Sequence, residues 1–135
     1  MPNKLIDVES FMNRERLASF TTVDPKGRPH VVPVFFAYEN CKVFVQTSRK
    51  SVKVRNLEVN NNVAVAVYQG EEAVIIRGKG QVIDSENQFV KKTQEHIDKY
   101  NLLINSRGRN SLGIPLFDKR VRCVIEIIPE RTIFW

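Results

Sequence analysis

Four basic residues crowd into one short segment, TSRKSVKVRNL, which spans residues 47–57. No acidic residue lies between them, and the four cations are Arg49, Lys50, Lys53 and Arg55. The segment follows an expected strand and begins an expected short helix. Free N–H groups and the helix dipole already make a helix start electropositive, so cations are disfavoured there. An anion bound at this helix start would offset that placement.

The residue types in this segment suit a phosphate group. Ser48 and Ser51 offer hydroxyl donors, while Lys53 and Arg55 supply full charges beside free backbone N–H groups. A solvated basic face is an equally open interpretation of the residues alone. The sequence has no Walker loop and no GxGxxG motif, so it supports neither a P-loop nucleotide site nor a Rossmann dinucleotide site.

Composition sets wider bounds. The chain has 135 residues, 42% apolar and 27% charged, which predicts a single globular domain over residues 1–135. A net charge of +6 favours an anionic partner. No apolar stretch is long enough for a membrane span, so we expect a soluble, cytoplasmic protein. Cys41 and Cys123 belong to no metal-binding spacing, so no metal site and no disulfide are expected.

The periodicity of apolar residues predicts a mainly β protein with short helices. Strands are expected at residues 16–23, 28–37, 42–47, 63–68, 73–84 and 120–128. Helices are expected at residues 4–14, 51–59 and 86–100, and residues 104–118 are expected to form a loop. Hairpins without regular βαβ alternation favour a six-stranded antiparallel barrel with short flanking helices.

Some single residues carry further expectations. Gly78 and Gly80 lie on one face of a strand, which can therefore receive another backbone or a ligand. Pro33 cannot donate to a β-ladder, so it marks an edge, a bulge or a ligand contact. His30 has no catalytic partner in the sequence, although contact with a flavin or with haem stays open. His96 lies on the apolar face of its helix and is interpreted as structural.

Two segments carry a resemblance to a known family. They are LASFTTVDPKGRPHVVPVFFAYENCKVFVQTSRKSVKVRNLEVNNNVAVAV and VIIRGKGQVID. Together they resemble the FMN-binding split β-barrel family typified by pyridoxamine 5′-phosphate oxidase. The closing RCVIEIIPERTIFW is similar to the last strand and tail of its small members. The resemblance implies a homodimer with flavin sites at the subunit interface.

The resemblance also implies a set of cofactor-binding residues. The Ser-x-Lys element at Ser51 and Lys53 would hold the FMN phosphate. Residues 46–48 would pack along the ribityl chain, and the backbone of residues 32–35 would pass the isoalloxazine ring. The full set is Val32, Pro33, Val34, Phe35, Gln46, Thr47, Ser48, Ser51, Lys53 and Arg55.

The implied function is an FMN-binding oxidoreductase that transfers hydride or electrons between flavin and a small organic substrate. No Ser/His/Asp set or carboxylate pair stands out, so the chemistry would belong to the cofactor. A deazaflavin (F-420)-dependent reductase on the same fold stays open. So do a non-enzymatic flavin carrier or sensor, and a small barrel that binds single-stranded nucleic acid. Such a barrel would stack bases on Phe35, Phe36, Tyr38 and Phe44.

Overall fold

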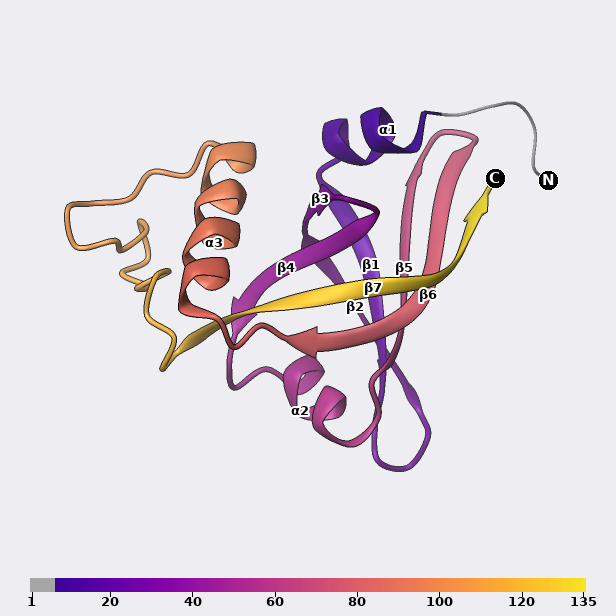
Figure 1. Ribbon diagram of the computed structural model, residues 1–135, viewed down its shortest axis with the longest axis horizontal. Coiled ribbons are helices and arrows are strands. Elements are labelled where there is room, and N and C mark those ends of the chain that lie inside the picture. The colour runs from indigo at the N-terminus through magenta and orange to yellow at the C-terminus, as the bar shows by residue number, and fades with distance from the viewer. Residues whose placement is uncertain (1–6) are drawn as a thin grey trace.

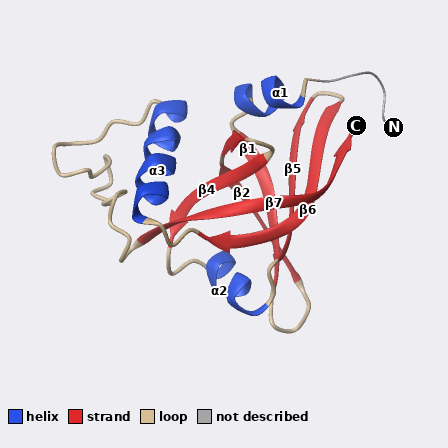
Figure 2. Ribbon diagram, in the orientation of Figure 1, coloured by secondary structure: helices blue, strands red, loops and turns tan. Residues whose placement is uncertain are grey.

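The computed structural model describes residues 7–135. Seven strands form one antiparallel sheet in the order β2-β1-β5-β6-β7-β4-β3, and the sheet curls into a split barrel with three helices around it (Figures 1 and 2). The strands are β1 (Leu17–Val23), β2 (Pro29–Phe35), β3 (Ala37–Glu39), β4 (Lys42–Ser48), β5 (Asn62–Gln69), β6 (Glu72–Val82) and β7 (Arg122–Phe134). The expected mainly β, antiparallel barrel is therefore confirmed, with one strand more than the six that were predicted.

The additional strand arises because the expected strand 28–37 is divided at Phe36. Before Phe36 the chain runs as β2 at one edge of the sheet, and after it the chain runs as β3 at the other edge. The Tyr100 hydroxyl bonds both backbone groups of Phe36, with the amide N at 2.9 Å and the carbonyl O at 2.6 Å. This anchor replaces the ladder partners that Phe36 lacks, so the chain can pass between the two edges.

The last strand is longer than expected, because β7 continues through Pro129 instead of ending before it. Pro129 pairs with Gly78 where the β6–β7 register shifts, so a bulge accommodates the missing N–H. A Cβ atom on Gly78 would lie 2.0 Å from the Ile128 carbonyl O. The glycine face was expected to receive either another backbone or a ligand. At Gly78 it receives the backbone of β7.

The helices are α1 (Val8–Arg14), α2 (Val52–Val59) and α3 (Glu86–Tyr100). The expected first helix, 4–14, begins outside the described residues. Ser85 caps α3, since its hydroxyl accepts a hydrogen bond from the Gln88 amide at 3.3 Å. No helix in residues 7–135 is long and apolar enough to cross a membrane.

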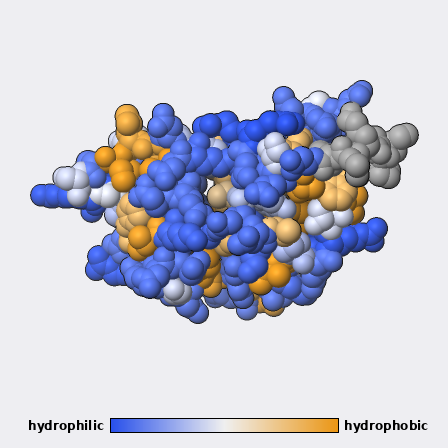
Figure 3. Space-filling view, turned by 45° about the horizontal axis from the view of Figure 1, so that its top comes forward, coloured by the Kyte–Doolittle hydropathy of each residue, from blue (hydrophilic) through white to orange (hydrophobic). Residues whose placement is uncertain are grey.

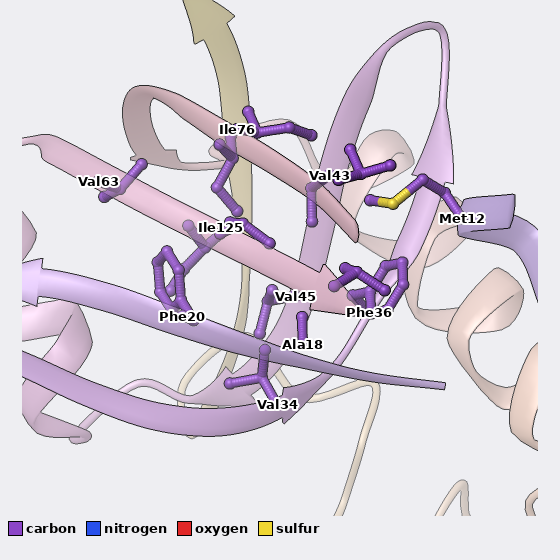
Figure 4. Packing of buried hydrophobic residues seen from close by; sticks show 14 of the residues in the cluster. Met12, Ala18, Phe20, Val34, Phe36, Val43, Val45, Val63, Ile76 and Ile125 are labelled. Carbon is purple, nitrogen blue, oxygen red and sulfur yellow. The ribbon is translucent and has the colours of Figure 1, made fainter. Parts of the chain in front are cut away.

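The core fills the inside of the curled sheet (Figure 4). Side chains from β1, β2, β4, β5, β6 and β7 meet there, and α1 closes one end with Phe11 and Met12. The cluster includes Ala18, Phe20, Val34, Phe36, Val43, Val45, Val63, Ile76 and Ile125 (Figure 4). Hydrophilic residues cover most of the face in Figure 3, with separate apolar patches between them.

Candidate functional site

A cleft of about 310 Å³ is lined by residues of α2, α3, β4 and the start of β7. Strand β2 forms one wall, and the loop between α3 and β7 forms another. Six of the ten residues implied by the resemblance line it: Pro33, Val34, Phe35, Gln46, Thr47 and Lys53. The other six lining residues are Val45, His96, Leu102, Asn110, Leu116 and Arg122.

Strand β2 lines this cleft with Pro33, Val34 and Phe35. It is an edge strand, so every second N–H and C=O group points away from the sheet. Pro33 lies on this edge strand and pairs with Ser19 of β1. An edge position is one of the placements expected for it from the sequence. The Val34 side chain belongs to the core and that of Val32 packs against it, and Val32 does not line the cleft.

Lys53 is the one member of the basic cluster that lines this cleft. Burial lowers its pKa, and the nearby positive charge of Arg122 lowers it further. Within residues 7–135 Lys53 forms no salt bridge with an acid. A half-buried cation without an acid partner is costly unless an anion joins it.

The other three cations of the cluster point elsewhere. The Arg49 Nε atom donates to the Lys119 carbonyl O at 2.7 Å. Lys50 and Arg55 are exposed. Arg55 lies two positions after Lys53, a spacing that places the two side chains on opposite faces of a helix. The cluster is thus divided between one cleft residue and a solvated surface.

The two serines lie at the entrance to α2. Ser51 is the N-cap residue, but its hydroxyl donates to the Ser48 carbonyl O at 2.8 Å and caps no helix N–H group. The Ser48 hydroxyl accepts from the Lys50 amide at 3.3 Å. Within the described chain the first-turn N–H groups of α2 therefore have no capping side chain, which leaves them available to an anion.

Arg122 is the second half-buried cation of the cleft. Its Nε and Nη2 atoms donate to the Gln46 amide oxygen at 3.1 and 2.7 Å. The Gln46 amide nitrogen donates in turn to the Leu116 carbonyl O at 2.7 Å. Burial lowers the pKa of Arg122, and no acid of the described chain pairs with it. Gln46 thus connects a fixed guanidinium to the loop that borders the cleft.

His96 projects from α3 into the same cleft and is only 9% exposed. Burial, together with the charges of Arg122 and Lys99, lowers its pKa to about 4, so the imidazole is neutral at pH 7. Its ring lies 5.3 Å from that of Tyr100. The sequence predicted a structural role for His96. The side chain is buried as expected, but it also lines the cleft. His30 lies on β2 opposite Thr22 and does not line the cleft.

Sequence reasoning could not single out Arg122 as a site residue. The alternation of the last strand places it on the side opposite Cys123, but that pattern names no partner for the guanidinium. Its partner Gln46 is 76 positions away, and the two meet only because β4 pairs with β7. Among the described residues, no group of three or more His, Cys, Asp or Glu side chains could hold a metal ion.

Comparison with known proteins adds family membership to this geometry. A family model described as pyridoxamine 5′-phosphate oxidase matches residues 6–135. The chain belongs to this family. No curated protein sequence gives a significant match to the chain.

Solved structures share this fold of the pyridoxamine 5′-phosphate oxidase family. A conserved protein from Mycobacterium tuberculosis is 19% identical, with a TM-score of 0.80 over 97% of this chain and 85% of that one. A protein titled an F-420 reductase is 22% identical, with a TM-score of 0.74 over 96% and 98%. The heme storage protein of Vibrio cholerae is 19% identical, with a TM-score of 0.73 over 93% and 90%. At these identities the likeness concerns the fold.

Proposed function

We propose that the cleft binds FMN and that the protein is a flavin-dependent oxidoreductase. The observation that carries the proposal is Lys53 in the first turn of α2, a half-buried cation with no acid partner in residues 7–135. A phosphate group placed there would pair with Lys53 and accept hydrogen bonds from uncapped helix N–H groups. Such a site selects a phosphorylated cofactor over its neutral analogue.

The rest of the cleft suits the other parts of the cofactor. The main chain of β2 from Val32 to Phe35 offers edge N–H and C=O groups to a flat heterocycle. Thr47, near the end of β4, is buried and lines the same cleft, and it would contact the ribityl chain of the cofactor. When bound, the flavin would exchange hydride or electrons with a small organic substrate, while the chain binds and orients both.

A homodimer belongs to the same proposal. Strand β2 is an edge strand with two large apolar residues on its open side, Val31 at 61% and Phe35 at 49% exposure. Exposed apolar residues on a strand edge are typical of an interface. A second copy against β2 would enlarge the 310 Å³ cleft, and the cofactor would then lie between two subunits.

The deazaflavin F-420 is the second candidate cofactor, favoured by the structural likeness to a protein titled an F-420 reductase. A side-by-side titration of the purified protein with FMN and with F-420 separates the two, since each changes its visible spectrum on binding. We expect FMN to bind at micromolar concentration. Binding of F-420 alone would transfer the proposal to that cofactor, and binding of neither would overturn it.

The structure offers less support for a nucleic-acid-binding barrel. Of the four aromatic residues that would stack bases, Phe36 is 0% and Phe44 is 7% exposed. Stacking platforms need exposed ring faces along a basic groove. Both of these side chains instead belong to buried clusters.

A further inference from the structure

Arg122 has donor capacity that the protein itself does not use. Gln46 accepts from Nε and Nη2, whereas the Nη1 amino group has no hydrogen-bond partner in residues 7–135. The guanidinium is half buried, lines the cleft and is held in position at one edge only. A planar fork fixed in this way is suited to an anion that accepts along its open edge.

The surroundings of Arg122 combine polar and apolar groups. His96 and Asn110 line the cleft with it and can each donate or accept a hydrogen bond. Leu102, Leu116 and the exposed ring of Phe35 supply apolar surface. An anion that carries an apolar body fits this combination better than a bare inorganic ion, because the body covers surface that water would otherwise contact.

We propose that Arg122 and His96 form a recognition site for the carboxylate of a small organic acid that carries an apolar or aromatic body. The guanidinium pairs with the carboxylate, and the neutral imidazole donates a hydrogen bond to it. Gln46 acts as a positioning residue, since it fixes the guanidinium without contacting the acid. That this acid is the substrate rests on the proposed flavin function, whereas its binding does not.

The proposal has a measurable electrostatic consequence. The charged and titratable groups around His96 are Arg122 from β7, Lys53 across the cleft on α2, and Lys99 and Tyr100 on α3 itself. The cations among them hold the pKa of His96 low. A bound carboxylate opposes their field and raises that pKa. By linkage, the carboxylate form of the acid then binds more tightly as pH falls from above the raised pKa of His96 toward about 4.

Proton NMR can follow this residue directly, because the chain has two histidines and a His30→Gln variant assigns the other ring. The probes are benzoate and its neutral analogue benzamide, each titrated into the protein without FMN and then with FMN. Benzoate is expected to raise the pKa of His96 by about one unit. Benzamide is expected to leave it near 4. Inorganic phosphate is an anion without an apolar body, and it is expected to bind more weakly than benzoate.

Variants locate the effect. Arg122→Gln should weaken benzoate binding by about tenfold or more, since a charge-assisted hydrogen bond is lost, and Arg122→Lys should retain part of it. Arg120→Gln is the matched control, because that side chain is exposed and paired with Asp118. Far-UV circular dichroism and the His30 resonance check that each variant folds.

Three outcomes would overturn the proposal. In the first, Arg122→Gln and Arg122→Lys leave benzoate binding unchanged. In the second, benzoate does not change the pKa of His96. In the third, benzoate and benzamide bind equally well. Failure of the flavin proposal would be visible separately, as an unchanged FMN spectrum. The benzoate titration without FMN would still report on Arg122 and His96.

Discussion

The amide oxygen of Gln46 accepts two hydrogen bonds from the Arg122 guanidinium, at 3.1 and 2.7 Å. This contact joins β4 to the start of β7 and fixes the cation at the cleft wall. It also makes Gln46 a place where the charge of the cleft can be changed without a change in shape.

Gln46→Glu should place a carboxylate on the edge of the Arg122 guanidinium that Gln46 already holds, so that it offsets the positive charge without blocking the open edge. We expect the pKa of His96 to rise above about 4 in the absence of any ligand, and benzoate affinity to fall by about tenfold or more. Proton NMR and calorimetry measure the two effects. Gln46→Leu is the control, since it removes the hydrogen bonds without adding charge. A His96 pKa that rises equally in both variants would contradict this account.

Gly78→Ala should destabilise the protein strongly, because its Cβ would lie 2.0 Å from the Ile128 carbonyl O at the β6–β7 bulge. The backbone cannot withdraw without breaking the ladder, so we expect a loss of about 3 kcal/mol or more in the free energy of unfolding. Chemical denaturation measures it. Gly80→Ala should cost less, since its Cβ meets movable methyl groups of Leu57 and Val63 at 3.0 and 3.1 Å. Equal losses would refute the steric argument.

Lys92 anchors α3 to the sheet. Its buried ammonium group pairs with Glu39 and Glu95 and lies 3.9 Å from the centroid of the Phe44 ring. Lys92→Ala should lower the free energy of unfolding by about 2–4 kcal/mol, because it removes the buried stem, leaves Glu95 without its partner and leaves Glu39 with only the longer contact to Lys91. Lys91→Ala removes only an exposed ammonium group 4.0 Å from the same Glu39 carboxylate, so it should change the free energy of unfolding by less than about 0.5 kcal/mol. Similar losses in the two variants would show that Lys92 has no special role.

The ion pair between Glu39 and Lys92 should make stability depend on pH. The Lys92 ammonium group holds the pKa of Glu39 below its ordinary value of 4.5. An acid whose folded-state pKa is lowered stabilises the fold above its unfolded pKa, and that contribution is lost as pH falls through the folded pKa. The stability difference between wild type and Glu39→Gln should therefore shrink as pH falls from 7 to 3. A constant difference would contradict the ion pair.

Much of the fold followed from local sequence signals. The Asp24-to-Gly27 turn, the alternating burial of β5 and the Ser85 cap of α3 all depend on residues within a few positions of one another, whereas β4 is buried on both faces. Most elements therefore formed close to their expected positions; the exceptions are the strand divided at Phe36 and the longer β7. The continuation of β7 through Pro129 could not be foreseen, because a partner glycine at a bulge on β6 permits it.

Some residues of the candidate site could likewise be found from local sequence signals, whereas others required the folded structure. The proposed phosphate-binding role of Lys53 rests on residue types within one short segment. His96 and Arg122 could not be found in that way, since their place in the cleft depends on how α3 and β7 pack against β4. The separation of Arg55 from Lys53 likewise required the actual helix geometry of α2.

In the proposed function, Lys53 binds the phosphate of a flavin cofactor. The most direct test is to titrate FMN and riboflavin into wild type and Lys53→Ala, because only FMN carries a phosphate. We expect Lys53→Ala to weaken FMN by about tenfold or more and to leave riboflavin almost unchanged. Lys50→Ala, an exposed cation in the same segment, should change neither. Equal weakening of FMN and riboflavin by Lys53→Ala would contradict the claim.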